Sequence, residues 1–397
     1  MIIYNFSGDP SYLRGEHKAD FNKMIGRKKI LLVSNAFYPE ISPRSFRCTE
    51  LVKEFYRQGH DVTVISKIRA HDYSEFLKEF PVSLKMWSKP LFPKVPESRH
   101  KYLSYLSKLV ARVLSLLFEY PAIEEMFQVK RILNHESGYD FMISFAVPFP
   151  IHWGVAITHS KKNPIARTWV ADCGDPYMFA RLDSFRKPFY FKIPETYFCR
   201  KCDFISIPFY EMQVQFYPQF ISKIRVIPQG FNFEEIRLYE GHTNNQKPVF
   251  KFAGSIIPGR RDLKLFFEFL NTLQFDFLFV VYTNQREWFA KYIKALGHKL
   301  EVNGYIERLP LLFELSKADF LVNVDTVLDN HSNIEAVPSK LIDYALTNRP
   351  ILNIISDYLD KELVMKFMNK DYSGKRLVDK SNFDIRKVSA QFLALID

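Results

Sequence analysis

The chain has 397 residues, of which 47% are hydrophobic and 25% charged, a composition typical of globular proteins too long for one compact core. Its 14 glycines and 4 cysteines exclude collagen-like chains and small disulfide scaffolds. No apolar run reaches the roughly 18 residues that a membrane span needs, and the N-terminus lacks the layout of a signal peptide. We therefore expect a cytoplasmic protein of two domains.

The formal net charge of +11 is unevenly distributed. Residues 1–230 hold 33 of the 55 Lys and Arg and 22 of the 44 Asp and Glu, so the remaining residues are neutral overall. A basic part beside a neutral one indicates that the N-terminal domain meets an anionic partner, such as a membrane surface, a phosphorylated substrate or nucleic acid. The alternative is charge that serves solubility alone.

Residues 28–232 carry the pattern of a doubly wound α/β domain. After a lead over residues 1–27, apolar runs at 30–33 and 62–65 flank a helical pattern that stops at Gly59. Apolar runs of this length are typical of buried parallel strands, and the set predicts a βαβ unit. Further strands are expected at residues 141–144, 168–171, 204–207 and 225–227.

Residues 98–121, between these strands, have a basic amphipathic pattern. Leucine and valine recur on a broad face, Lys101, Lys108 and Arg112 share a narrow polar stripe, and no acidic residue occurs until Glu119. Such a helix either lies in an anionic membrane surface or packs on the sheet, as helices of α/β domains do. The basic charge of the N-terminal part favours contact with a membrane.

The α/β alternation restarts near Val249, after a polar stretch without periodicity. We assign residues 246–385 to a second Rossmann-like domain and residues 386–397 to a C-terminal helix. Two such domains facing each other leave a cleft at the carboxyl ends of their strands, where open α/β sheets bind their ligands. Loops that follow strands are therefore the places where functional residues are expected.

The spacing of Gly, Asp and His excludes several reaction classes. No two glycines and no two aspartates lie two residues apart, so the GxGxxG, GxSxG and DxD patterns are absent, as are the P-loop and HExxH motifs. The pair Cys199 and Cys202 has no second pair to complete a zinc site. We expect no bound metal, no cofactor, and ordinary thiols in a reducing compartment.

The strongest local feature runs from Glu335 to Asp343, two carboxylates that flank a predicted helix start. Pro338 suits the first turn, because its missing N–H would be unpaired there. The free amides of Ser339 and Lys340 then lie at the positive end of the helix dipole, which favours a phosphate. The alternative is an ordinary helix cap with solvated charges.

The chain resembles the family 4 glycosyltransferases of the GT-B fold at several places, in the family's order. In the first domain the similar segments are KILLVSNAFYPE, GHDVTVIS and VIPQGFN. In the second they are FAGSI, VNGYIERLPLLFELSKADFLV and EAVPSKLIDYALTNRPIL, the last of which matches the family's two acidic residues separated by seven others. The resemblance covers about residues 28–360. It implies two facing Rossmann-like domains and a metal-independent, configuration-retaining transfer of a sugar from a nucleotide diphosphate donor.

The resemblance also implies a donor site in the second domain, with a UDP-sugar as the expected donor. Glu335 would contact the donor sugar, Asp343 the ribose, and the backbone at Gly304 and Tyr305 the nucleobase. The residues expected to bind the donor nucleotide are Ser255, Lys264, Gly304, Tyr305, Pro338, Ser339 and Asp343. Those expected to act in catalysis, where charge develops on the departing diphosphate, are Glu335, Arg260, Arg261 and Lys340.

Two positions depart from the family's pattern. The second acidic residue is Asp343 rather than glutamate and is one methylene shorter. Gly254, Ser255 and Ile256 stand where the family has an arginine after the glycine. We expect Arg260 or Arg261 to replace that arginine beside the diphosphate.

Residues that bind the acceptor are expected on loops of the first domain. The loop after the first strand carries Phe37, Tyr38 and Arg44. His152 begins a helix after another strand, where it either binds a sugar hydroxyl or caps the helix. Asp175 lies in a segment similar to one found in a bacterial subset of the family.

These observations predict a cytoplasmic glycosyltransferase, peripheral on an anionic membrane surface, that acts on a lipid-linked or saccharide acceptor in the synthesis of a surface polysaccharide or glycolipid. A non-catalytic GT-B scaffold or nucleotide-sugar-binding partner protein is the alternative, and the two departures favour it. A third possibility is an enzyme that glycosylates nucleic acid. The lack of a lysine run beside aromatic residues argues against nucleic acid as a partner.

Overall fold

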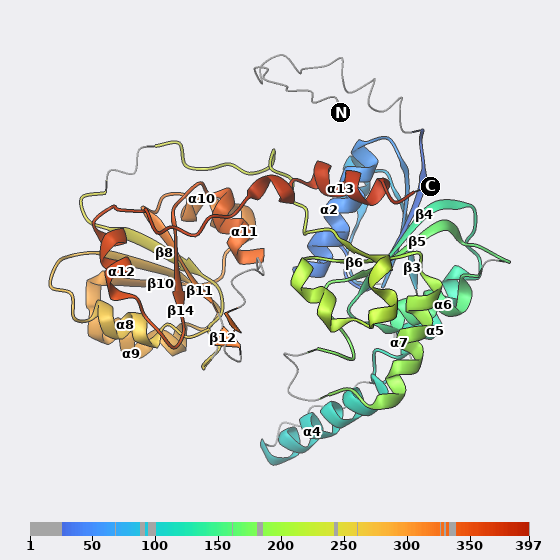
Figure 1. Ribbon diagram of the computed structural model, residues 1–397, viewed down its shortest axis with the longest axis horizontal. Coiled ribbons are helices and arrows are strands. Elements are labelled where there is room, and N and C mark those ends of the chain that lie inside the picture. The colour runs from blue at the N-terminus through green and yellow to red at the C-terminus, as the bar shows by residue number, and fades with distance from the viewer. Residues whose placement is uncertain are drawn as a thin grey trace. The chain divides into compact units, whose positions relative to one another are not determined.

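The computed structural model describes residues 26–67, 69–87, 92–93, 101–160, 162–180, 186–241, 245–259, 261–325, 327–328, 331–332 and 339–396. The chain divides into two compact units (Figure 1). Unit 1 comprises residues 1–227 together with 389–397, and unit 2 comprises residues 228–388. Each unit is built around its own parallel sheet, as the two apolar alternations in the sequence predict.

Unit 1 contains a seven-stranded sheet in the order β3-β2-β1-β4-β5-β6-β7, and its neighbouring strands are all parallel. Ile30, Leu31, Leu32 and Val33 are all fully buried. Because successive side chains of a strand point to opposite faces, both faces of the sheet are covered. The strands are β1 (Lys29–Ser34), β2 (Asp61–Lys67), β3 (Ser83–Trp87), β4 (Tyr139–Ala146), β5 (Ala166–Cys173), β6 (Phe204–Ile207) and β7 (Ile224–Val226).

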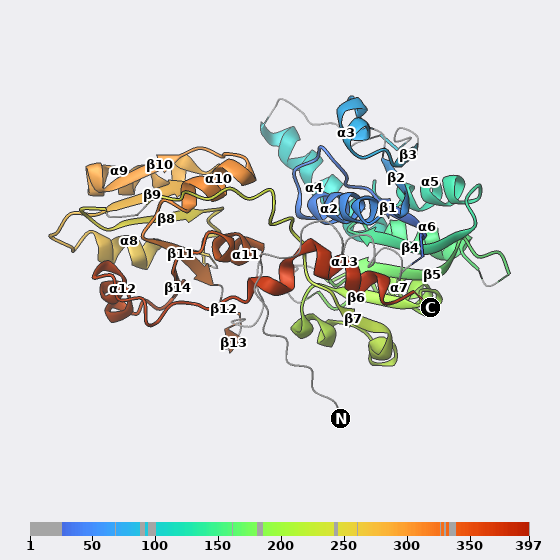
Figure 2. The same cartoon turned by 90° about the horizontal axis from the view of Figure 1, so that it is seen from above.

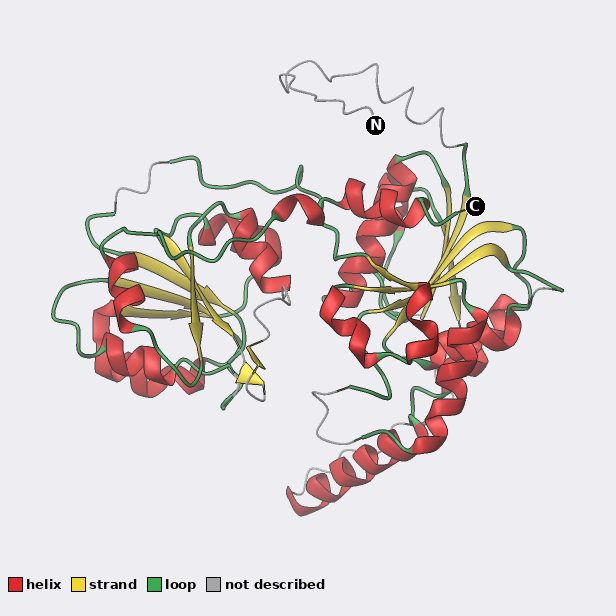
Figure 3. Ribbon diagram, viewed as in Figure 1, coloured by secondary structure: helices red, strands yellow, loops and turns green. Residues whose placement is uncertain are grey.

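Helices connect these strands and flank the sheet (Figure 3). Helix α2 begins at Pro43, and the side chain of Ser42 caps it by accepting a hydrogen bond from the Ser45 amide. This arrangement satisfies one of the amides that a helix start leaves unpaired. The helices of unit 1 are α2 (Pro43–Arg57), α3 (Ser74–Glu79), α4 (Lys101–Phe118), α5 (Glu124–Leu133), α6 (Pro150–Thr158) and α7 (Lys192–Lys201). Its 3-10 helices are η2 (Phe189–Phe191), η3 (Tyr210–Gln215) and η4 (Pro218–Lys223).

Unit 2 contains a five-stranded parallel sheet in the order β10-β9-β8-β11-β14. Its core is rich in phenylalanine: the ring of Phe250 on β8 stacks on Phe279 of β9 and Phe320 of β11, at centroid distances of 4.8 and 4.9 Å. The strands are β8 (Val249–Ala253), β9 (Leu278–Tyr282), β10 (Leu300–Asn303), β11 (Phe320–Asp325) and β14 (Ile351–Ile355), with a separate hairpin of β12 (Val327–Leu328) and β13 (His331–Ser332).

Helices also flank the sheet of unit 2, as the view from above shows (Figure 2). The α-helices are α8 (Lys264–Leu270), α9 (Ala290–Leu296), α10 (Arg308–Leu315), α11 (Ser339–Leu346), α12 (Lys361–Met368) and α13 (Ile385–Leu393). The 3-10 helices are η5 (Arg286–Phe289), η6 (Gly297–Lys299) and η7 (Lys380–Phe383). Within the ranges that the structure describes, no helix is both long enough and apolar enough to cross a membrane.

The structure differs from the expected domain limits at both ends of unit 2. Residues 228–232 lie in unit 2, because the amide of Phe231 donates to the Phe383 carbonyl and that of Ile385 donates to the Phe231 carbonyl. Helix α13 starts in unit 2, but its residues from Ser389 onward belong to unit 1, where Ser389 accepts a hydrogen bond of 2.7 Å from Gln58.

Candidate donor and acceptor sites

The carboxyl ends of β8, β9 and β10 meet at one edge of the sheet in unit 2, where a hollow of about 640 Å³ lies. It is lined by Gly304 after β10 and by the segment from Thr283 to Trp288 after β9. Polar and aromatic side chains above the carboxyl ends of parallel strands are the usual setting for a nucleotide in α/β folds. Gly304 is one of the residues that the sequence predicts for nucleobase binding.

The loop after β8 is held in place by hydrogen bonds to a residue that lines this hollow. The side chain of Gln285 accepts a hydrogen bond of 2.6 Å from the Ile256 amide and donates one of 3.2 Å to the Ile256 carbonyl. The backbones of Ile257 and Arg261 exchange two further hydrogen bonds. Gly254 has a φ of 138°, which side chains rarely adopt, so glycine is required at that turn. The loop therefore presents Ser255, which is exposed, from a fixed backbone.

Lys340 lies on α11 beside this loop, and its amino group is buried. Its Nζ atom lies 3.6 Å from the centroid of the Phe252 ring and 5.2 Å from that of Tyr344. No hydrogen-bond partner for Nζ occurs in the described part of the chain. Burial lowers the pKa of Lys340 well below its ordinary value, Arg261 lowers it further, and the carboxylate of Asp325 opposes both. A buried ammonium without a partner is unfavourable, so the position favours an anionic ligand.

A buried polar network lies next to Lys340 at the ends of β11 and β14. Asn323 donates to Asp325 at 2.9 Å and to Asn353 at 2.6 Å, and Asn353 in turn donates to Asp325 at 2.8 Å. Both oxygens of the Asp325 carboxylate therefore accept a hydrogen bond, which holds the negative charge in place. Sequence reasoning missed this network. The sequence feature that could have revealed it is the presence of two asparagines and an aspartate inside otherwise apolar strands.

Asp343, expected to bind the ribose, forms an ion pair with Arg308. The Nε and NH2 atoms of Arg308 lie 2.9 and 2.8 Å from Oδ1 of the carboxylate, and the guanidinium lies 4.2 Å from the Phe231 ring centroid. Burial raises the pKa of Asp343 above its ordinary value, and Arg308 lowers it. Both contacts use one oxygen of the carboxylate, so the other can accept a ligand hydroxyl. Sequence reasoning did not single out Arg308.

The remaining donor-side predictions fall into three groups. Glu335, Arg260, Pro338 and the side chain of Ser339 lie outside the described residues, although α11 does begin at Ser339. Tyr305 comes after Gly304 in the loop that follows β10, and it is half exposed. Lys264 is 62% exposed and lies 3.9 Å from Glu268 on its own helix, which is the geometry of a solvated surface residue rather than of a phosphate ligand.

In unit 1, the structure brings two of the predicted acceptor residues together. Arg44 at the start of α2 and Asp175 after β5 form an ion pair of 2.5 Å, and both are partly exposed. A buried pair lies behind them: Arg47 donates from Nε and NH2 to the two oxygens of Asp172, at 2.7 Å each. Arg47 also donates to the Ile227 carbonyl at 3.0 Å. These contacts fix the loop positions at the carboxyl edge of the sheet.

Two predicted acceptor residues lie in the core instead. His152 is fully buried on α6, where Ser144 lies 2.8 Å from Nδ1 and the thiol of Cys173 lies 3.6 Å from Nε2. Burial lowers the pKa of His152 to about 3, so the ring is neutral. Phe37 is 1% exposed and packs edge-on against Phe76. Neither side chain can reach an acceptor, whereas Tyr38 remains partly exposed.

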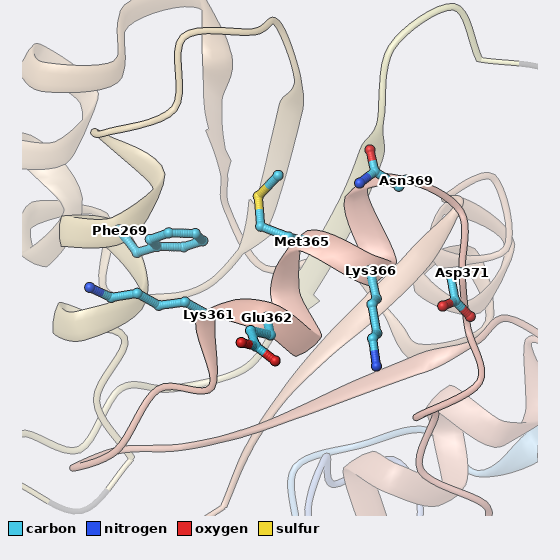
Figure 4. Close-up of a pocket in the computed structure, with 7 residues that line it drawn as sticks. All are labelled: Phe269, Lys361, Glu362, Met365, Lys366, Asn369 and Asp371. Atoms are coloured by element: carbon cyan, nitrogen blue, oxygen red, sulfur yellow. The ribbon is translucent and has the colours of Figure 1, made fainter.

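A second hollow, of about 460 Å³, lies between α8 and α12 rather than at the strand ends (Figure 4). Lys361 extends alongside the ring of Phe269, at 5.8 Å from its centroid. Helices of an α/β unit cover the faces of the sheet, so this hollow is separate from the edge where ligands bind. Within the described ranges no three His, Cys, Asp or Glu side chains gather as a metal site would require.

The chain has the two-domain fold of GT-B glycosyltransferases. No protein-family model and no curated protein matches it. HepE of Anabaena in complex with UDP is 12% identical, over 93% of this chain and 96% of that one, with a TM-score of 0.55. The lipopolysaccharide outer core galactosyltransferase WaaB is 12% identical over 93% of this chain and 99% of that one, with a TM-score of 0.56. A glycosyltransferase from Rickettsia africae is 12% identical over 93% of this chain and 93% of that one, with a TM-score of 0.54.

Proposed function

We propose that the protein is a glycosyltransferase that moves a sugar from a UDP-sugar to a lipid-linked or saccharide acceptor. The observation that carries this proposal is the buried amino group of Lys340 beside the loop after β8, which has no hydrogen-bond partner within the described part of the chain. A diphosphate at this position supplies the anionic hydrogen-bond acceptors that Nζ of Lys340 lacks among the described residues. HepE, which shares the fold, was solved with UDP and with UDP-glucose, and this supports uridine as the base.

In this proposal the donor lies along the carboxyl edge of the sheet in unit 2. The nucleobase occupies the hollow at Gly304, next to the backbone of Tyr305. The ribose hydroxyls bind to Asp343, and Arg308 orients that carboxylate and counters the rise in pKa that burial causes. The phosphates lie between the loop at Ser255 and Lys340. Each group thus meets a side chain or backbone of matching polarity.

The chemistry requires stabilisation of the charge that develops on the departing diphosphate. Fixed cations aimed at those oxygens stabilise the transition state without a metal. Lys340 and Arg261 carry out this role, together with Arg260, and the Asp325 network holds Lys340 in place through its charge. Glu335 binds the donor sugar. Transfer with retained configuration follows the family that the sequence resembles, and the leaving phosphate accepts the proton of the acceptor hydroxyl.

The acceptor binds in unit 1 at the pair formed by Arg44 and Asp175, beside Tyr38. A charged pair with exposed polar atoms can donate to and accept from the hydroxyls of a sugar. All four cysteines are free and buried, which supports a cytoplasmic location. We place the reaction in the synthesis of a surface polysaccharide or glycolipid.

The test is calorimetric titration of the purified chain with UDP, GDP, ADP and dTDP, followed by assays for hydrolysis of the matching nucleotide sugars. The proposal expects one base to bind best, and UDP to be that base. Binding without any turnover of the sugar nucleotide would favour the non-catalytic scaffold. Failure of all four nucleotides to bind would refute a donor site altogether.

A further inference from the structure

Most of the described side chains of helix α4 are exposed, and the others, Ser104, Ser107, Ala111, Leu114 and Leu116, are half-buried. None of its described side chains is buried, although helices of an α/β unit normally bury one face. Tyr102 is 90% exposed, Leu106 53% and Leu109 47%. At a helical rise of about 1.5 Å per residue, the helix is roughly 27 Å long. An apolar surface of this length on one helix marks a site of interaction.

Strong contacts hold α4 to unit 1 at its C-terminal end. Glu119, which follows the helix, is buried, pairs with Lys187 and accepts a hydrogen bond of 2.9 Å from the Tyr177 hydroxyl. The Tyr190 hydroxyl donates to the Leu117 carbonyl. Figures 1 and 3 show the rest of the helix extending away from the sheet. The helix is therefore presented in a fixed direction instead of packing on the sheet.

A second apolar segment lies at the anchored end. Phe189 on η2 is 85% exposed, and Ile193 in the first turn of α7 is 72% exposed. The hydrogen bond from Tyr190 to Leu117 places this segment beside α4, although the two are separated by some seventy residues of sequence. We call α4, η2 and the first turn of α7 the α4 surface.

The charges of the α4 surface are basic. Helix α4 contains no Asp or Glu, and both Lys108 and Arg112 are exposed on its polar stripe. In residues 186–201 the single acidic side chain, Glu195, is 1% exposed, whereas Arg186 and Lys192 are exposed. Apolar side chains flanked by exposed cations match an anionic phospholipid surface, because acyl chains take up the former and headgroups attract the latter.

We propose that the α4 surface docks the protein on an anionic bilayer, with α4 lying in the plane of the headgroups. Its exposed leucines and valines enter the acyl boundary, while Lys108 and Arg112 extend along their aliphatic stems to the phosphates. Tyr102 and Tyr105 have the amphipathic rings that are enriched at this depth. Two cations near mid-helix make a crossing orientation costly, and no described helix meets the requirements of a span. Docking does not depend on donor binding and goes beyond the proposed function.

The first test is flotation of the full chain, without nucleotide, with vesicles of phosphatidylcholine alone or mixed with phosphatidylglycerol. The wild type is expected to float with the mixed vesicles at low salt and to be released by high salt. Each cation near an anionic surface contributes about a five-fold change in partition. Lys108→Gln with Arg112→Gln should therefore lower partition about 25-fold. The matched control is Lys130→Gln with Arg131→Gln, an exposed pair on α5 with the same change in net charge.

The control pair should retain binding to within a few-fold. A wild type that stays at the bottom of the gradient with mixed vesicles refutes the proposal. Equal losses in both double variants also refute it, because the attraction would then come from net charge alone. If the wild type fails to float and light scattering shows a dimer that Leu106→Ser converts to monomer, the occupant of the surface is a second copy of the chain.

The second test measures the orientation of the helix. A tryptophan is introduced on the apolar face in Leu106→Trp, or on the opposite face in Ser115→Trp; both positions are exposed, so either variant should fold. Of the four tryptophans, Trp87, Trp153 and Trp169 are buried and Trp288 is half-buried in unit 2, outside the α4 surface, so all four should respond little to lipid. Brominated acyl chains are expected to quench the added fluorescence of Leu106→Trp and not that of Ser115→Trp. Equal quenching of the two, or quenching of neither, contradicts a helix lying in the membrane plane.

Discussion

Substitution of Lys340 by methionine tests the donor site most directly. Methionine keeps the aliphatic length over the rings of Phe252 and Tyr344 but removes the charge. Hydrogen bonds to charged groups contribute about 1.5–3 kcal/mol, so UDP should bind roughly 10- to 150-fold more weakly. The protein itself should be as stable as the wild type or more so, because a buried amino group without a hydrogen-bond partner among the described residues is replaced by an apolar group.

The pH dependence of UDP binding gives a second measurement of Lys340. In the free protein its pKa lies well below the ordinary value, whereas a bound diphosphate raises that pKa again. Binding therefore takes up a proton between the two pKa values. In this window the affinity falls by up to ten-fold per pH unit as the pH rises, and it is constant below the free pKa and above the bound one.

Calorimetry in buffers of different ionisation enthalpy measures this proton uptake. The uptake should disappear in Lys340→Met and persist in Lys294→Met, which changes an exposed lysine on α9. Unchanged UDP affinity in Lys340→Met would show that the ammonium does not meet the diphosphate. Proton uptake that persists in Lys340→Met would assign it to another group.

Three further substitutions test neighbouring parts of the site. Asp343→Ala should weaken UDP binding by about 1–3 kcal/mol, and Arg308→Ala should weaken it less; unchanged affinity in Asp343→Ala, measured by calorimetry, would remove this carboxylate from the ribose site. Glu335→Gln should lower kcat for sugar transfer far more than it alters the Kd for UDP, whereas equal losses would mean that Glu335 only shapes the start of α11. Asn353→Ala leaves Asp325 short of a hydrogen bond in a buried network and should lower the free energy of unfolding by about 1–3 kcal/mol, measured in urea; a loss below about half a kcal/mol would mean that water replaces the amide.

Much of the architecture could be predicted from short apolar runs. The strand predicted at residues 204–207 is β6 itself, and the run at 30–33 is the interior of β1. Strand β3 was missed because its sequence, SLKMW, mixes polar and apolar residues, as suits a strand at the edge of the sheet whose first four side chains are not buried. Apolar patterning thus identifies interior strands better than edge strands.

From the sequence, the candidate site could be predicted only at the level of the loops that carry its residues. Spacing from a strand end shows which loop carries a residue, but not the direction of its side chain. Arg44 and Asp175 are 131 residues apart and form an ion pair at the expected edge, whereas His152 and Phe37 turn into the core. The sequence did not indicate Arg308, because an arginine in the first turn of a helix is common. Only the structure shows that it pairs with Asp343 on another helix.

The division of the chain between the units has a consequence for its synthesis. Unit 1 contains the sheet that comes first in the chain but also includes residues from Ser389 onward, whose contacts include the ring of Phe392 at 5.5 Å from the Arg47 guanidinium. Domains generally fold in order as the chain leaves the ribosome. Here the N-terminal unit acquires its final contacts only after the whole of unit 2 has been made. A nascent or truncated chain that ends at residue 388 has every strand of both sheets, yet its first domain is unfinished.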